Sequence, residues 1–278
     1  MKVIIQKPDL DTCLTALIMG VSRNDVVCVE NNGASPEDIA DSSVICIESG
    51  GSGLVSLNNF DHHDPDKYFP PACQQAYEHR NIKDEMLGRL VRYVCIVDDR
   101  PNEHPPIQFP SLSSIFSGML LYEKEPLEQL FSGIDMLKTV LANGIDPFES
   151  VPDLEIWHQY KEKKQKNLYE LEKILSQAEF FETDNGTKSA YLESSAIGGI
   201  GSLYAQNCGV VIIYSPSFGN PPIRKFTIAS QNKNVSILLD ELKKFEEGWG
   251  GRETIIGSPR SGTMLDKTKV LSLVKKLL

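Results

Sequence analysis

The chain has 278 residues, of which 41% are hydrophobic and 24% are charged. This composition is typical of a globular protein, and no stretch reaches the roughly 20 apolar residues that cross a bilayer, which argues against a membrane protein. The net charge of −10 argues against long duplex nucleic acid as a ligand, because a duplex requires a basic face. The N-terminus does not resemble a signal peptide and the six cysteines contain no C-x-x-C pair, so we expect a cytoplasmic protein with reduced thiols.

The first part of the chain alternates short apolar runs with a helical pattern. We predict strands at residues 2–6, 26–30, 43–48 and 54–60, with a helix at 9–23 after the first of them. Strands that alternate with helices indicate a parallel sheet. In such a sheet, ligands bind at the carboxyl ends of the strands.

The pattern becomes helical from Pro70. We predict helices at residues 72–77, 84–97, 127–141 and 157–178, the last ending near Glu182. After a turn-rich segment, strands are expected at 189–194, 209–215 and 224–230, followed by a helix at 236–246 and a terminal helix. The predicted fold class is therefore α/β, with a larger N-terminal parallel-sheet domain (1–183) and a smaller C-terminal α/β domain (187–278).

Two acidic side chains follow the first predicted strand. Asp9 and Asp11 stand two residues apart where the strand gives way to a helix. Clustered carboxylates are the ligands that hard divalent cations prefer, although a helix N-cap would explain an isolated pair equally well.

A second polar motif follows the fourth predicted strand. Asp61, His62 and His63 are consecutive, in a chain with only five histidines. Imidazole is a common metal ligand, and a neighbouring histidine could hydrogen-bond a phosphoryl oxygen. Together the two motifs predict a metal site at one edge of the sheet.

The order of these motifs resembles the DHH phosphoesterase superfamily, which includes RecJ-type exonucleases, nano-RNases and family II pyrophosphatases. The resemblance implies a site with one or two Mn²⁺ or Mg²⁺ ions, located between the two domains. It makes ligands of Asp9, Asp11, His62 and Glu48, and of Asp98 rather than its neighbour Asp99. His63 would face the substrate phosphate, and Asp61 would steady a histidine.

The chain departs from the family pattern at the first ion. Ile5 stands where the family usually has a histidine, and Glu48 replaces a common aspartate. In the C-terminal domain, the resemblance makes Ser230, Gly250, Gly251 and Arg252 substrate-binding residues, with Arg252 in place of the usual histidine. Trp249 could equally stack on a base or pack in the core.

The resemblance implies a manganese-dependent phosphoesterase that hydrolyses a small phosphate ester, such as a short oligonucleotide, a dinucleotide or a nucleoside bisphosphate. Two alternatives stay open. One is a pyrophosphatase or exopolyphosphatase. The other is a catalytically degenerate nucleotide-binding protein, an alternative that Ile5 keeps open. A homodimer also stays open, and no membrane partner is expected.

Overall fold

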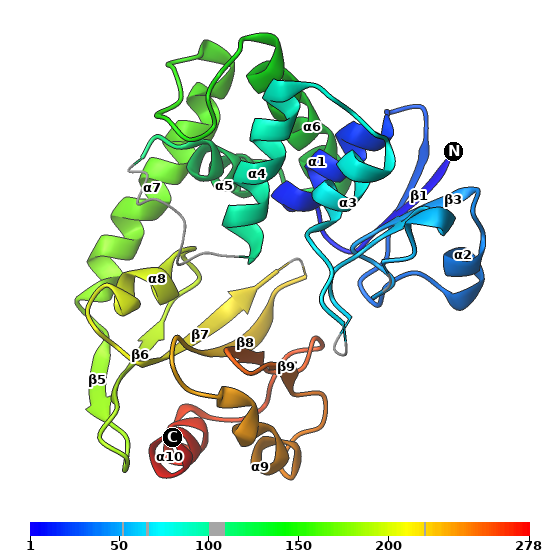
Figure 1. The fold of residues 1–278 in the computed structure, drawn as a ribbon. Helices are drawn as coiled ribbons and strands as arrows, with labels where there is room; N and C mark the ends of the chain where they lie inside the picture. Colours follow the sequence, from blue (N-terminus) through cyan, green and yellow to red (C-terminus); the bar gives the residue numbers. More distant parts are fainter. Residues whose placement is uncertain (52, 65–66, 100–108, 220) are drawn as a thin grey trace. The chain divides into compact units, whose positions relative to one another are not determined.

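The computed structural model describes residues 1–51, 53–64, 67–99, 109–219 and 221–278. The chain divides into two compact units, Met1–Lys164 and Gln165–Leu278, and each is described by itself (Figure 1). This division falls inside the helix α7 (His158–Leu175). The domain boundary expected at residues 183–187 stays a prediction.

The first unit is built on a four-stranded sheet in the order β2-β1-β3-β4, in which all neighbouring strands are parallel. The strands are β1 (Lys2–Ile5), β2 (Val26–Val29), β3 (Val44–Ile47) and β4 (Asn59–Phe60). Side chains alternate between the two faces, so Val3 and Ile5 join the main core while Ile4 joins a small cluster on the other face. The carboxyl ends of β1, β3 and β4 therefore meet at one edge.

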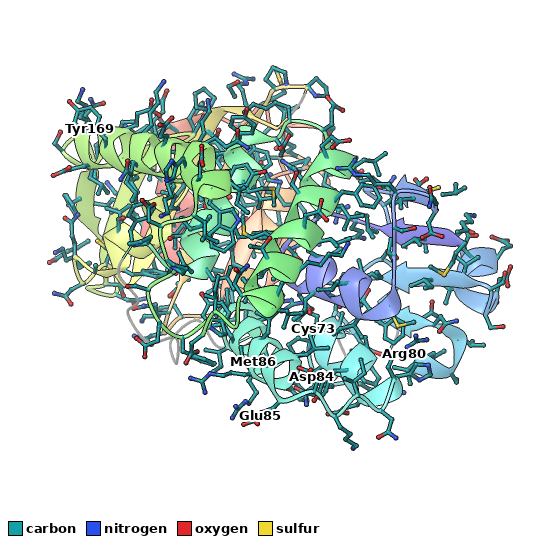
Figure 2. All side chains as sticks on the ribbon, turned by 90° about the horizontal axis from the view of Figure 1, so that it is seen from above. Cys73, Arg80, Asp84, Glu85, Met86 and Tyr169 are labelled. Atoms are coloured by element: carbon teal, nitrogen blue, oxygen red, sulfur yellow. The ribbon has the colours of Figure 1, made fainter. Side chains whose placement is uncertain are left out.

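Helices of the main core contact the strands of this sheet: α1 (Leu10–Met19), α3 (Ala72–His79) and α6 (Pro126–Ala142). Further helices pack on these, namely α4 (Glu85–Asp99) on α1 and α3, α5 (Leu112–Tyr122) on α6, and the first part of α7 on α5, whereas the short α2 (Pro36–Ala40) lies beside β3. Local sequence sets several helix starts. Ser111 forms a capping box with Ser114 at α5, and the Asp84 carboxylate accepts a hydrogen bond from the Leu87 amide at the beginning of α4. Figure 2 labels Cys73 in the first turn of α3, and Asp84 where α4 begins.

The second unit contains a six-stranded mixed sheet in the order β5-β6-β7-β8-β10-β9. Its strands are β5 (Glu179–Glu182), β6 (Lys188–Glu193), β7 (Val210–Phe218), β8 (Ile223–Ser230), β9 (Gly250–Arg252) and β10 (Ile255–Gly257). One face packs on α9 (Leu239–Lys243) and α10 (Lys267–Leu277), and the other packs on α8 (Gly199–Tyr204). Tyr214 and Phe226 point toward the first face, where Trp249 is buried beside them.

The predicted α/β fold class is confirmed, and several element boundaries are wrong. Residues 54–60 were expected to be one strand, but Val55–Leu57 form a 3-10 turn and β4 contains only two residues. The helix expected to end near Glu182 ends at Leu175, and the Glu-Phe-Phe-Glu segment Glu179–Glu182 pairs with β6 as β5. The helix α5 was not predicted. Within the described part of the chain, no helix combines the length and apolarity needed to cross a membrane.

Candidate metal centre

The two aspartates after β1 have different surroundings. Asp9 caps α1, because its Oδ1 accepts a hydrogen bond of 3.0 Å from the Thr12 amide. Asp11 lies buried in the first turn of α1, and its carboxylate accepts the amides of Ala72 and Cys73 at 2.8 and 2.7 Å. The N-terminus of α3 thus fixes the orientation of the Asp11 carboxylate. Burial raises the pKa of Asp11 to about 6 despite these hydrogen bonds.

Glu48 follows β3 directly and is almost completely buried. Its backbone has a φ of 47°, in the left-handed region that non-glycine residues rarely adopt. The Thr12 hydroxyl donates a hydrogen bond of 2.7 Å to Glu48 Oε2, which leaves Oε1 directed toward His62. Burial and the nearby negative charge of Asp9 raise the pKa of Glu48 to about 8.

His62 lies between two carboxylates. Its Nε2 is 3.2 Å from Glu48 Oε1 and 3.1 Å from Asp98 Oδ2, and Asp98 comes from the end of α4. Burial lowers the pKa of His62, but the adjacent carboxylates of Asp98 and Glu48 outweigh it and raise this pKa to about 10. The side chain of Asp99, the alternative ligand considered from the sequence, lies outside the part of the chain that the structure describes.

His63 lies beside this cluster in a more exposed position, with its Nδ1 3.7 Å from Glu48 Oε1. Its Nδ1 lies 2.9 Å from Asp61 Oδ1, and 40% of its side chain is exposed. The buried Asp61 carboxylate also accepts the amides of Gly50, Gly51 and His63. Burial opposes ionisation of Asp61, but these hydrogen bonds lower its pKa to about 2, so the carboxylate stays charged and orients the imidazole.

Two overlapping groups of ligand atoms among the described residues have the spacing of a divalent metal site. Atoms from Asp11, Glu48, His62 and Asp98 lie within 4.8 Å of one another, and so do atoms from Glu48, His62 and His63. Ligands bound at about 2.1 Å to an octahedral ion are about 3 Å apart, close to the distances around His62 Nε2. Within the described residues, Glu48 Oε1 and His62 Nε2 are buried without a hydrogen bond of acceptable geometry. Three carboxylates and one imidazole suit a Mn²⁺-like or Mg²⁺-like ion, and the residues present fit it.

Asp9 has a different neighbour. The Lys7 ammonium lies 2.7 Å from Asp9 Oδ2, and the charge of Asp9 raises the pKa of this exposed lysine. The groups of described residues with metal-ligand spacing do not include Asp9. Because Ile5 supplies no ligand and Lys7 supplies a positive charge at Asp9, the residues present fit one ion better than two.

Comparison with family models finds no match for the sequence, and comparison with curated proteins finds none either. Solved structures do match. The pGpG-specific phosphodiesterase PggH from Vibrio cholerae is 13% identical in sequence, and the match covers 98% of this chain and 96% of that protein at a TM-score of 0.58. The chain therefore shares the overall fold of this phosphodiesterase. A member of the S1p family of ribosomal proteins, solved as its DHH domain, is also 13% identical, with 98% and 85% of the two chains covered at a TM-score of 0.47.

The predicted substrate-binding residues lie in the second unit of the chain. The buried Ser230 hydroxyl donates to the Gly209 carbonyl at 2.7 Å and accepts the Lys233 amide at 2.9 Å, so it stabilises the turn after β8. Gly250, Gly251 and Arg252 form the exposed strand β9. Their contact with a substrate stays a prediction.

Trp249, for which stacking on a base and packing in the core were equally open, belongs to the core. Its side chain is 2% exposed, and its indole N–H donates to Glu246 at 3.0 Å. Several residues beside the ligand cluster were not predicted from the sequence, chiefly Thr12, Lys7 and the backbone amides that hold Asp11 and Asp61. Backbone amides carry no sequence signal, and only the folded chain brings Thr12 to Glu48.

Proposed function

We propose that this protein is a metal-dependent phosphodiesterase that hydrolyses short oligonucleotides, with linear dinucleotides as the preferred class. The observation that carries the proposal is the convergence of Asp11, Glu48, His62 and Asp98 at the carboxyl ends of the strands. The fold likeness to PggH, a phosphodiesterase specific for pGpG, supports the choice of substrate. The net charge of −10 also favours a small substrate over a long polyanion.

The metal ligands and the residues beside them have separate roles in this proposal. Asp11, Glu48, His62 and Asp98 would hold one Mn²⁺ or Mg²⁺ ion. When bound, such an ion supplies Lewis acidity and an acidified water. The charged Asp61 carboxylate holds His63 Nδ1, which leaves the other ring nitrogen available to hydrogen-bond a phosphoryl oxygen. Thr12 holds Glu48 Oε2, so that Oε1 stays directed at the cluster.

A second candidate is a nucleotide-binding protein without turnover. The ion pair between Lys7 and Asp9 favours it, because a positive side chain lies at a carboxylate that would otherwise be available to a second ion. A hydrolysis assay distinguishes the two candidates, because a one-ion enzyme with reduced activity still turns over its substrate and a non-catalytic binding protein does not. The pyrophosphatase alternative differs in its substrate.

The test is turnover by the full-length chain of a linear dinucleotide, a short oligoribonucleotide and pyrophosphate, each with Mn²⁺ and with EDTA. We expect Mn²⁺-dependent hydrolysis of the nucleotides that His62→Ala abolishes. The matched control is His158→Ala, because His158 is an exposed histidine paired with Asp153, outside the cluster. Hydrolysis of pyrophosphate alone would assign the pyrophosphatase function. Nucleotide binding without any turnover would refute the proposed hydrolase and assign the binding protein.

A further inference from the structure

One face of the sheet in the second unit presents polar side chains. In the antiparallel register of β7 and β8, Ser215 pairs with Lys225 and Ile213 pairs with Thr227. Successive side chains of a strand point to opposite faces, so these four residues share a face. Arg224, the neighbour of Lys225 on β8, points to the other face and is exposed.

The helix α8 covers only part of this face. Gly199, at its start, lies against Ile213 and Leu192, since a Cβ there would be 3.2 and 3.4 Å from their side chains. Beyond this contact, the face borders a cavity of about 190 Å³. The segment from Ser194 to Ile200 forms one wall, and Ser215, Phe218, Lys225 and Thr227 line the sheet side. The cavity is large enough for a phosphate group and a small part of the molecule that bears it.

Hydroxyl groups and one ammonium group line this cavity. Ser194 and Ser215 are 5% and 6% exposed, and the Ser215 hydroxyl lies 2.8 Å from that of Ser195. Their rotatable O–H groups can donate hydrogen bonds to an anion. Gly257, beside Thr227 on β10, has no side chain, and this leaves room for the Lys225 stem.

Lys225 is half-buried and has no carboxylate partner among the described residues. Its ammonium group lies over the Phe218 ring, 4.8 Å from the centroid. Burial lowers the pKa of Lys225, and the positive charge of Arg260 lowers it further. A partly desolvated ammonium group near a second cation favours a bound anion, because an anion offsets both the desolvation and the repulsion.

We propose that this cavity binds the phosphate group of a small phosphate monoester, with Lys225 as its charged ligand and the serine and threonine hydroxyls as further donors. Phe218 and Ile197 at the rim are 49% and 45% exposed, and they would contact an apolar or planar part of the same molecule. The site lies entirely within the second unit. It therefore does not depend on the metal cluster or on the proposed hydrolysis.

The experiment measures binding of inorganic phosphate and of adenosine monophosphate to the full chain by calorimetry, without added metal, in a His62→Ala background that removes a metal ligand. We expect both to bind, and Lys225→Met to weaken each by about tenfold or more, as the loss of a charge-assisted hydrogen bond implies. Arg224→Met removes the same charge from the opposite face of the same strand, and it should change the affinity by less than about twofold.

Two further comparisons make the result decisive. Lys225→Arg keeps the charge and should retain most of the binding, which would distinguish lost charge from lost folding. Tighter binding of the nucleotide than of phosphate would support contacts at the rim, and equal binding would support a site for the phosphate group alone. The proposal is overturned if neither ligand binds at millimolar concentration, or if Lys225→Met and Arg224→Met weaken binding equally.

Discussion

Thr12 provides a direct test of how the buried Glu48, a proposed metal ligand, is held. Its side chain is 0% exposed, and its hydroxyl donates a hydrogen bond of 2.7 Å to Glu48 Oε2. Thr12→Val keeps the shape of the side chain and removes the donor. A hydrogen bond to a charged group contributes about 1.5–3 kcal/mol, and residues that orient metal ligands commonly contribute 10- to 100-fold in metal affinity. We therefore expect Mn²⁺ binding to weaken about 10- to 100-fold.

The matched control is Thr15→Val, one turn further along α1. Thr15 is also 0% exposed, and within the described residues its hydroxyl has no hydrogen-bond partner. This substitution should leave Mn²⁺ affinity unchanged, and it should not lower the free energy of unfolding, because it removes an unsatisfied buried hydroxyl. Calorimetric titration of the metal-free protein with Mn²⁺ measures both affinities. Equal affinities for Thr12→Val and Thr15→Val would refute the role assigned to Thr12.

The remaining predictions concern protons, stoichiometry and the β9–β10 hairpin. Because the pKa of Glu48 is about 8, above its ordinary 4.5, Mn²⁺ must displace a proton, so its affinity should rise from pH 6 to pH 8. The metal-free protein should lose stability from pH 6 to pH 8, because the pKa of Glu48 is higher in the folded state than in the unfolded chain. Thermal denaturation at several pH values should show a smaller loss for Glu48→Gln. Metal analysis after dialysis should find one Mn²⁺ per chain in the unmodified protein and closer to two in the Ile5→His, Lys7→Met double variant. Two ions in the unmodified protein would contradict the inference of a one-ion site. Gly251→Ala should lower the free energy of unfolding by about 2 kcal/mol or more, because φ at Gly251 is 144° and a Cβ there would lie 2.3 Å from a backbone oxygen. Gly250→Ala is the control, since a Cβ there meets no atom within 4 Å, and it should change the free energy of unfolding little. Denaturant titrations measure both variants.

Much of the fold could be predicted because the strands of the first unit are short, apolar and separated by turn residues. The errors came from segments in which two patterns overlap. The Glu-Phe-Phe-Glu run at residues 179–182 follows a long amphipathic helix and contains no helix-breaking residue, so the sequence alone favoured continuation of the helix. Pairing with β6 makes it a strand, and a single segment carries no signal for that pairing.

The candidate site shows the same division between local and tertiary information. The resemblance to the DHH superfamily selected Asp11, Glu48 and His62 in advance, and each of them follows a strand of one parallel sheet, whose strand ends meet at one edge. The Lys7–Asp9 ion pair, in contrast, depends on the direction of a flexible side chain. The hydroxyl of Thr12 is equally hard to foresee, because its partner lies 36 residues away in the sequence.

The left-handed backbone of Glu48 shows how function can oppose stability at a single position. Glycine adopts a φ of 47° without strain, and a side chain there costs of the order of 1 kcal/mol or more. Burial of an ionisable carboxyl group adds to that cost. Selection for thermal stability alone would favour glycine at this turn. With glutamate at this position, the metal-free fold is less stable than it would be with glycine. A bound cation would restore part of that stability, so the supply of the cation could determine how much folded protein is present in the cell.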